Sequence, residues 1–338
     1  MNIAHTFSRM IRRHRVGACI GVDVLLVLLL MPTIILPFAI DRIDGTSAPH
    51  GALADVLLSK GIPPMTTQFL ARPDGKIAFD DTGTPGPLVI CVPSMGDLRQ
   101  EYRYLTPQLA AAGFRVVTMD VRGHGASSVG WPDYSTAAVG SDVVALVRHL
   151  NTGPAFVIGT SMAGGASVWA AGEAPDLITG QVLIDAFVRD NPAGQSSSFF
   201  GDLMVKLALA KPWGAAAWSL YYKSLYPTAK PADLTAYRGA IKANMREPGR
   251  FAALKAMAMA SKADCEARLD DVKGPTFVIF GTKDPDFTHP EAEANWLSAR
   301  LHGRLLMVEG AGHYPHAEMP GQVGPAIIAF LQEHRTHA

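Results

Sequence analysis

Three residues far apart in the chain have the types that nucleophilic catalysis requires. Ser161 stands in the segment GTSMA at residues 159–163, Asp284 comes three positions after an apolar run that ends in glycine, and His313 follows the stretch GAG. A histidine that takes the proton of a serine hydroxyl makes it a nucleophile, and a carboxylate beside the histidine fixes its tautomer and stabilises its charged form. Ser161, His313 and Asp284 therefore have the side-chain types of a nucleophile, a base and an acid.

The elements expected around the serine would present its hydroxyl at a sharp turn. An apolar strand over residues 155–158 is followed by a helix of small residues that begins at Ser161. Neighbours two positions away crowd such a turn and must be small, a condition that both Gly159 and Ala163 meet. The helix N-terminus after Ser161 also favours the negative charge that develops during attack.

Short apolar runs alternate with helical patterns from residue 65 to the end of the chain. This alternation predicts an α/β fold with a doubly wound, mostly parallel sheet and helices on both of its faces. The expected strands are residues 68–71, 76–80, 88–92, 115–119, 155–158, 181–184, 276–280 and 304–308. The further helices expected beside this sheet are residues 102–112, 137–150, 291–301 and 322–334.

The alternation breaks between residues 187 and 270, where helix-forming residues dominate. Helical patterns there cover residues 203–209, 215–222, 233–244 and 250–260. A helical insertion of this kind predicts a cap over the carboxyl edge of the sheet, inserted before the penultimate strands. The core would then have a first part over residues 65–186 and a second part over residues 271–338.

Five motifs in this part of the chain resemble those of the α/β-hydrolase family. They are VPSMGD at 92–97, DVRGHGAS at 120–127, GTSMA at 159–163, FGTKDPD at 280–286 and GAGHYPHAEMP at 310–320. The order serine, acid, histidine along the chain is the order that this fold requires. The resemblance covers about 270 residues and implies a serine-nucleophile, capped, esterase-like member of the family, with Ser161 as nucleophile, His313 as base and Asp284 as acid.

The resemblance also implies an oxyanion hole and two places for the acid. The hole would consist of the backbone N–H groups of Met95 and Met162, although PS replaces the family's His-Gly turn here and leaves the choice between Ser94 and Met95 open. The family places its acid at Asp284, and Asp185, after the strand over residues 181–184, is the alternative acid. Three polar neighbours of these motifs are expected to have other roles: His124 and His316 structural ones, and Asp286 that of a solvated side chain.

The nucleophile type and the cap composition bound the substrate. Serine at position 161 excludes the epoxide hydrolases and haloalkane dehalogenases of this fold, which attack with aspartate. Aromatic side chains in the cap favour an apolar pocket, and the residues assigned to it are Trp213, Trp218, Tyr221 and Tyr222. We therefore expect hydrolysis of a carboxylic ester or related acyl bond in a small to medium apolar molecule, through an acyl-enzyme. No cofactor and no metal ion are expected.

Two other functions use the same residues and stay open. A carbon–carbon bond hydrolase or a cofactor-free perhydrolase or haloperoxidase would employ the same triad, and product identity separates these from an esterase. A non-catalytic ligand-binding member of the fold would normally lack a triad residue, and none is missing here. Oligomeric state is not indicated by the sequence.

Overall composition excludes several other classes of partner. Lysine plus arginine and aspartate plus glutamate number 30 each, so no basic surface for nucleic acid is indicated. The three cysteines, at positions 19, 91 and 265, are scattered and show neither a disulfide framework nor metal-ligand spacing.

The N-terminal segment has a different composition and suggests a membrane anchor. Residues 24–40 carry no charge and follow four arginines, so residues 1–40 are expected to be a cytoplasmic segment with an anchor helix within residues 16–40. A linker over residues 41–64 would follow. The positive-inside rule then predicts an extracytoplasmic hydrolase domain. The alternatives are a cleaved signal peptide and a cytoplasmic protein whose true start lies near Met65.

Overall fold

The structure is a computed structural model, and it describes residues 65–190, 192 and 213–335. The expected anchor and linker over residues 1–64 and the expected cap helix over residues 203–209 lie outside these ranges. No helix in the described ranges is long and apolar enough to cross a membrane. The longest of them have 15 residues, a length of about 22 Å against a hydrocarbon core of roughly 30 Å. The finding contradicts the predicted localisation: a membrane-anchored protein with an extracytoplasmic domain is not supported.

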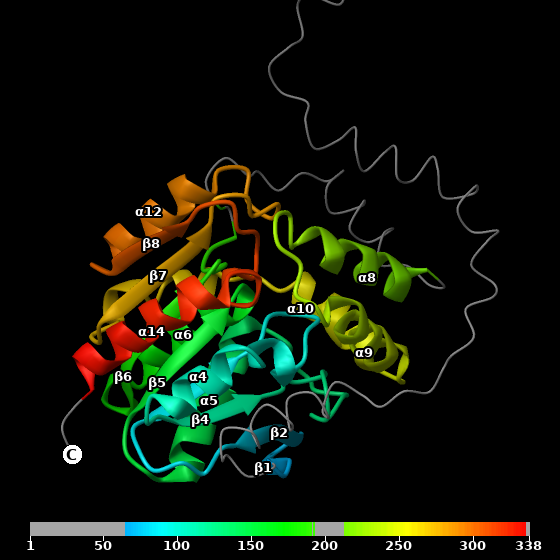
Figure 1. The fold of residues 1–338 in the computed structure, drawn as a ribbon. Coiled ribbons are helices and arrows are strands. Elements are labelled where there is room, and N and C mark those ends of the chain that lie inside the picture. Colours follow the sequence, from blue (N-terminus) through cyan, green and yellow to red (C-terminus); the bar gives the residue numbers. More distant parts are fainter. Residues whose placement is uncertain (1–64, 191, 193–212, 336–338) are drawn as a thin grey trace, which may run out of the picture. The chain divides into compact units, whose positions relative to one another are not determined.

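An eight-stranded sheet forms the centre of the described part of the chain (Figure 1). Its strands stand in the order β1-β2-β4-β3-β5-β6-β7-β8. Their bounds are β1 Gln68–Arg72, β2 Gly75–Asp81, β3 Leu88–Val92, β4 Arg115–Met119, β5 Ala155–Thr160, β6 Ile178–Ile184, β7 Thr276–Gly281 and β8 Arg304–Val308. β1 and β2 pair antiparallel with each other and β2 pairs antiparallel with β4, whereas all the other pairs are parallel. The predicted α/β-hydrolase fold is therefore confirmed.

The central parallel strands are apolar because helices cover both faces of the sheet. β3, β5 and β7 are buried along their whole length, as expected for parallel strands between two layers of helices. Alternate residues of β3 enter separate apolar clusters: Ile90 packs in the cluster with α5 (Thr136–Leu150) and α6 (Met162–Glu173). Cys91 packs in the cluster with α4 (Leu105–Ala111) and α14 (Pro320–His334). α12 (Pro290–Arg300) joins α6 in a third cluster.

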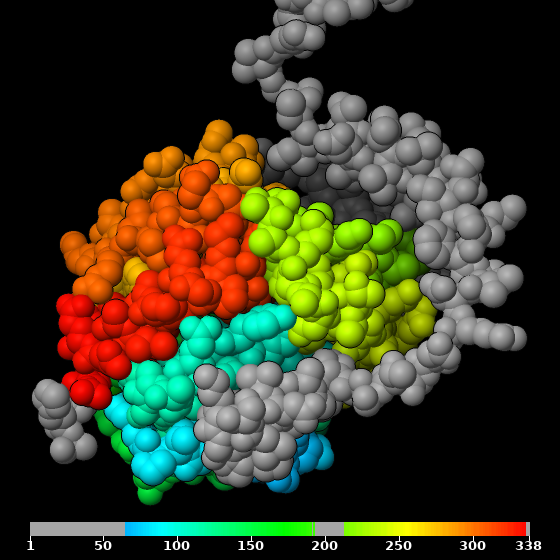
Figure 2. Space-filling view, in the orientation of Figure 1, coloured from blue at the N-terminus to red at the C-terminus, as the bar shows by residue number. Residues whose placement is uncertain are grey.

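Helices inserted between β6 and β7 form the described part of the cap (Figure 1). They are α8 (Gly214–Ser224), α9 (Leu234–Arg246) and α10 (Arg250–Ala258), followed by the short α11 (Ala263–Glu266) and η3 (Leu269–Asp271). The apolar faces of α8, α9 and α10 pack in one cluster with Leu98, Tyr314 and Ala317 from the core. Cys265 of α11 and Leu269 of η3 belong instead to the cluster of α6 and α12. In Figure 2 the yellow-green cap surface accordingly borders the red C-terminal segment.

One expected helix begins later than predicted, and several short elements had no periodic signal. The helix expected over residues 102–112 is α4, which begins at Leu105, and a separate short helix, η1 (Arg99–Tyr102), precedes it. The residues of η1 are buried and polar, with Arg99 bonded to two aspartates and Tyr102 to the carbonyl of Val92. Side-chain contacts with the core, which periodicity does not record, therefore shape this segment. The turns η2 (Pro175–Leu177) and α13 (Pro315–Glu318) are too short for a periodic pattern.

Candidate active site

Ser161 lies on a strained turn between β5 and α6. Its backbone has φ 59° and ψ −124°, in the left-handed half of conformational space that side chains other than glycine rarely adopt. The segment after β6 holds this turn from both sides. Ser161 N–H donates to the carbonyl of Ile184 at 2.8 Å, and Phe187 N–H donates to the carbonyl of Ser161 at 3.0 Å. Such strain persists where surrounding contacts over-determine the backbone, and it concentrates at functional sites.

Small residues around the serine are required by close approach of other backbone. A Cβ on Gly159 would lie 2.3 Å from the carbonyl oxygen of Ala163, and a Cβ on Gly164 would lie 2.3 Å from the Cβ of Ala186. The expected crowding at the turn is therefore present at Gly159. Gly164 has a role that the sequence did not reveal, since the absence of a side chain there makes room for Ala186, in the segment that leaves β6.

The loop after β3 presents one backbone N–H group that is not already bonded. Ser94 N–H donates to Glu101 Oε2 at 2.7 Å, and Gly96 N–H donates to His124 Nε2 at 3.1 Å. Among the hydrogen bonds of the described residues, none is donated by Met95 N–H or by Met162 N–H, the first N–H of α6. The two N–H groups expected to bind an oxyanion are thus both available for an external acceptor.

His124 holds the loop after β3, in keeping with the structural role expected for it. Its Nδ1 bonds with the carbonyl of Arg122 at 3.0 Å, which leaves Nε2 to accept from Gly96. Burial lowers the pKa of His124 to about 4, so the ring is neutral near pH 7. A neutral ring is the form that can donate at one nitrogen and accept at the other.

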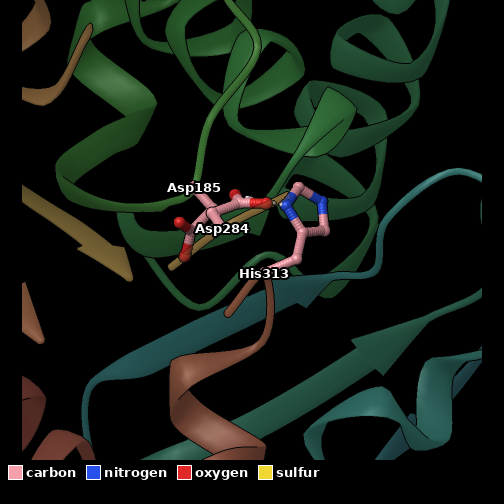
Figure 3. Close-up of side chains that lie close together, drawn as sticks. All are labelled: Asp185, Asp284 and His313. Carbon is pink, nitrogen blue, oxygen red and sulfur yellow. Dashed lines mark hydrogen bonds and ion pairs between the residues drawn. The ribbon is translucent and has the colours of Figure 1, made fainter. Parts of the chain in front are cut away.

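The loops after β7 and β8 bring Asp284 and His313 together (Figure 3). His313 Nδ1 lies 2.7 Å from Asp284 Oδ2, and both side chains are buried. Asp284 Oδ1 accepts from Asp286 N–H at 2.9 Å, and the backbone N–H of His313 donates to the carbonyl of Leu225 at 3.0 Å. The carboxyl ends of neighbouring parallel strands meet at one sheet edge, which explains how residues 29 positions apart form this pair.

The other ring nitrogen of His313 faces a second carboxylate. His313 Nε2 lies 3.6 Å from Asp286 Oδ2, and the described hydrogen bonds include none between His313 and Ser161 Oγ. Tyr221 OH of α8 donates to Asp286 Oδ1. Asp286 is therefore not the solvated neighbour expected from the sequence. Its side chain is only 16% exposed, because the cap covers it through Tyr221.

These two carboxylates decide the charge of the histidine. Burial lowers the pKa of His313, but the charges of Asp284 and Asp286 more than offset this effect and raise the pKa to about 9. Burial raises the pKa of Asp286 to about 6, although the neighbouring His313 lowers it. Near pH 7 the structure thus favours an imidazolium between two carboxylates.

Asp185, the alternative acid, lies beside the same pair (Figure 3). It follows β6, is fully buried, and its Oδ1 accepts from Gly281 N–H at 2.9 Å. One oxygen of Asp185, one of Asp284 and a ring nitrogen of His313 lie within 4.8 Å of one another. Both candidate acids are thus near the base, and the hydrogen bond to the ring comes from Asp284.

The same three side chains have the atom types that bind a divalent cation, but their spacing fits a proton better. His313 Nδ1 and Asp284 Oδ2 are 2.7 Å apart. Two atoms bound to one tetrahedral zinc ion at roughly 2.1 Å would stand about 3.4 Å apart. We therefore assign no metal ion to this cluster.

The four cap residues assigned to the pocket have different environments. Trp218 and Tyr222 are buried and contact the loop after β3: Trp218 Nε1 donates to the carbonyl of Gly96 at 3.1 Å, and Tyr222 OH donates to Asp97 Oδ2 at 2.7 Å. Tyr221 contacts Asp286, as described above. Trp213, at the start of α8, is 38% exposed.

Sequence reasoning missed Asp97 as the centre of a buried polar network. Besides Tyr222, it accepts a hydrogen bond from Tyr237 OH of α9. Ser94 Oγ and Tyr314 OH lie 2.6 Å apart in the same region. The last position of the VPSMGD motif was the available signal, since an acid in the loop after a buried strand is costly to bury without partners.

Comparisons with known proteins agree with this geometry. A family model described as the alpha/beta hydrolase fold matches residues 87–320. A Mycobacterium tuberculosis protein named as a non-heme bromoperoxidase, BpoC, is 28% identical over 271 residues, which are 75% of this chain and 97% of that relative. The 3-oxoadipate enol-lactonase 2 of Acinetobacter baylyi is 26% identical over 231 residues, 64% of this chain and 78% of the relative.

Solved structures show the same fold. A thermophilic esterase from Thermogutta terrifontis matches with a TM-score of 0.66 at 23% identity, over 80% of this chain and 99% of the esterase. The family model alone covers well over half of the chain. This chain belongs to the alpha/beta hydrolase fold family and is a hydrolase.

Proposed function

We propose that this hydrolase cleaves a carboxylic ester or related acyl bond of a small to medium apolar molecule through an acyl-enzyme. The observation that carries the proposal is the buried Asp284–His313 pair at 2.7 Å, at the sheet edge where Ser161 occupies a strained strand-to-helix turn. Relatives named as an enol-lactonase and as an sn-1-specific diacylglycerol lipase act on acyl–oxygen bonds and support this class. We retain the proposed division into core segments 65–186 and 271–338 with a cap over 187–270.

In the proposed mechanism His313 Nε2 takes the proton of Ser161 as the hydroxyl attacks the acyl carbon. Asp284 keeps the other ring proton on Nδ1 and stabilises the imidazolium that forms. The protonated ring then gives its proton to the leaving group, and water repeats the sequence to release the acid. Nε2 must leave Asp286 and reach Ser161 for this step; such contacts are often long without substrate and tighten when it binds.

The oxyanion of the tetrahedral intermediate would be held by the N–H groups of Met95 and Met162. The N–H groups of Ser94 and Gly96 are already bonded, so we favour Met95 over Ser94. Each such donor contributes roughly 3 kcal/mol to transition-state stabilisation. Trp218 would set the position of this loop, because its indole bonds to the carbonyl of Gly96.

A second candidate, cofactor-free perhydrolysis or haloperoxidation, is kept because of the bromoperoxidase-named relative. It would use the same triad, with hydrogen peroxide in place of water at the second step. The products distinguish the two reactions: a peracid forms only when peroxide resolves the acyl-enzyme. Carbon–carbon bond hydrolysis remains a variant that product identity would likewise reveal.

The ester hydrolase is tested with p-nitrophenyl esters of increasing acyl length. We expect wild-type turnover with a defined chain-length optimum, and Trp218→Ala to alter that optimum and lower kcat because the oxyanion loop loses its indole contact. Leu220→Ala is the matched control, because Leu220 is an exposed apolar residue of the same helix that is not assigned to the pocket. An unchanged length profile in Trp218→Ala would show that this side chain serves cap packing alone, and absence of any ester turnover would contradict the proposed function.

The pH dependence of the reaction should depend on Asp286. His313 must be neutral to accept the serine proton, so kcat/KM should rise with pH up to about 9, the pKa of His313. Asp286 raises that pKa, so Asp286→Asn should move the acidic limb to lower pH and increase the fraction of neutral base at pH 7. The measurement is kcat/KM between pH 6 and 10.5, with exposed Asp176→Asn as control. A limb that stays in place would show that Asp286 does not act on the base.

A further inference from the structure

We propose that Asp185 is a positioning residue of the triad, which acts as a neutral carboxylic acid and donates a hydrogen bond to Asp284. This inference rests on the proposed function, because it assigns Asp284 as the acid. It gives a role to a buried carboxyl group that the mechanism above does not use.

The sheet places Asp185 next to Asp284 and fixes its direction. β6 and β7 are paired neighbours, with Ile184 opposite Ile279, so both acids follow strands that end at the same edge. Asp185 N–H donates to the carbonyl of Ile279 at 2.8 Å, and its Oδ1 accepts from Gly281 N–H at 2.9 Å. Asp185 also has φ 43°, a left-handed conformation that costs stability in a residue with a side chain. In Figure 3 its carboxyl group lies with that of Asp284 beside the His313 ring.

Only one of the two carboxyl groups can easily be charged. They are both buried, and adjacent buried carboxylates do not ionise together. Asp284 accepts from two N–H groups, those of His313 and Asp286, which stabilise its charged form. Asp185 accepts from one, that of Gly281, and its Oδ2 is buried with no hydrogen-bond partner among the described residues.

The unpaired Oδ2 of Asp185 therefore indicates which carboxyl group carries the proton. A buried oxygen without a donor is costly as part of a carboxylate, whereas as a hydroxyl it can donate to Asp284. Burial, and then the charge of Asp284, raise the pKa of Asp185 well above its usual range. The titratable groups that face it are Asp284 and Asp286 on the loop after β7 and His313 on the loop after β8.

Asparagine at position 185 separates a neutral from a charged Asp185. Its amide can accept from Gly281 N–H and donate to Asp284, so Asp185→Asn should keep kcat within a few-fold of wild type and leave the acidic limb of kcat/KM in place. Asp185→Ala removes both bonds. The charge of Asp284 then acts more strongly on His313, so the limb should move to higher pH and kcat should fall. If Asp185 were charged in the wild type, asparagine would remove an anion beside His313 and move the limb to lower pH.

A stability measurement tests the protonation without any activity. A carboxyl group that stays protonated in the folded chain but ionises in the unfolded chain destabilises the fold above its ordinary pKa of about 3.9. Asparagine cannot ionise, so Asp185→Asn should unfold at a higher temperature than wild type near pH 7. This difference should shrink as the pH falls toward 4. A difference independent of pH would overturn the inference.

The outcomes separate failure of this inference from failure of the proposed function. Full activity in Asp284→Asn would remove the triad assignment, while the stability measurement would still report the protonation of Asp185. The positioning role alone would be overturned if Asp284→Asn were inactive while Asp185→Ala kept the wild-type kcat and the wild-type acidic limb of kcat/KM. A loss near 10⁴-fold in Asp185→Asn would make Asp185 the acid itself. If Asp185→Ala does not fold, Asp185→Asn decides whether Asp185 is neutral: an acidic limb that stays in place supports the inference, and a shift to lower pH overturns it.

Discussion

Replacing Ser161 with alanine is expected to remove almost all hydrolysis, a loss of up to about 10⁶-fold in kcat, while the fold is retained. The hydroxyl is the only side-chain nucleophile that the proposed mechanism uses, and the strained turn is held by backbone bonds to Ile184 and Phe187 that do not involve it. Alanine also tolerates φ 59° about as poorly as serine does. The unfolding temperature should therefore stay close to that of wild type. The measurement is turnover of the preferred p-nitrophenyl ester beside a thermal unfolding curve.

Ser167→Ala is a matched control for this variant. Ser167 is another buried hydroxyl on α6, and it donates to the carbonyl of Ala163 within the same helix. We expect this control to keep turnover near the wild-type value. If Ser161→Ala kept more than a few per cent of activity in a preparation free of contaminating esterase, another residue would be the nucleophile.

Asp284→Asn should lower kcat by about 10⁴-fold, the loss seen when an orienting acid is replaced by its amide. Two causes add up. An amide can present its N–H to His313 and so favour the wrong tautomer, and it no longer provides the charge that stabilises the imidazolium. The same variant should lower the pKa of His313, since Asp284 is the largest of the influences that raise it. Single-turnover kinetics and an NMR titration of His313 measure the two effects.

Asp185→Asn serves as the comparison, because it makes the same change on the neighbouring strand. We expect its loss to be far smaller than that of Asp284→Asn. The reverse ranking would move the acid from the loop after β7 to the end of β6. The 2.7 Å hydrogen bond between His313 and Asp284 would then have no role in catalysis.

Sequence alone could predict much of the fold because the parallel strands are continuous apolar runs. The bounds of β3, β4 and β8 agree with the expected strands at both ends. The strand–serine–helix and strand–histidine patterns are local in the chain, so their geometry follows from neighbouring residues. The topology of parallel strands then brings Asp284 to His313 without further information, as expected.

Contacts between the cap and the core could not be predicted in the same way. The exposure of Asp286 is decided by Tyr221, 65 positions earlier, and that of Asp97 by Tyr222 and Tyr237, more than 120 positions later. No periodicity links residues so distant. The sequence predicts a solvated Asp286, and the contact with the cap reverses that expectation.

The conformation of Ser161 has a consequence for how this sequence changes over generations. A residue with a side chain at φ 59° and ψ −124° is less stable there than glycine, by about 1–3 kcal/mol. Selection for folding alone would therefore favour glycine at position 161, and a lineage released from any demand on the hydroxyl would drift toward that replacement. Serine here opposes the thermodynamic preference of the backbone. The proposed role of Ser161 as nucleophile accounts for serine at this position, because glycine has no hydroxyl group to attack the substrate.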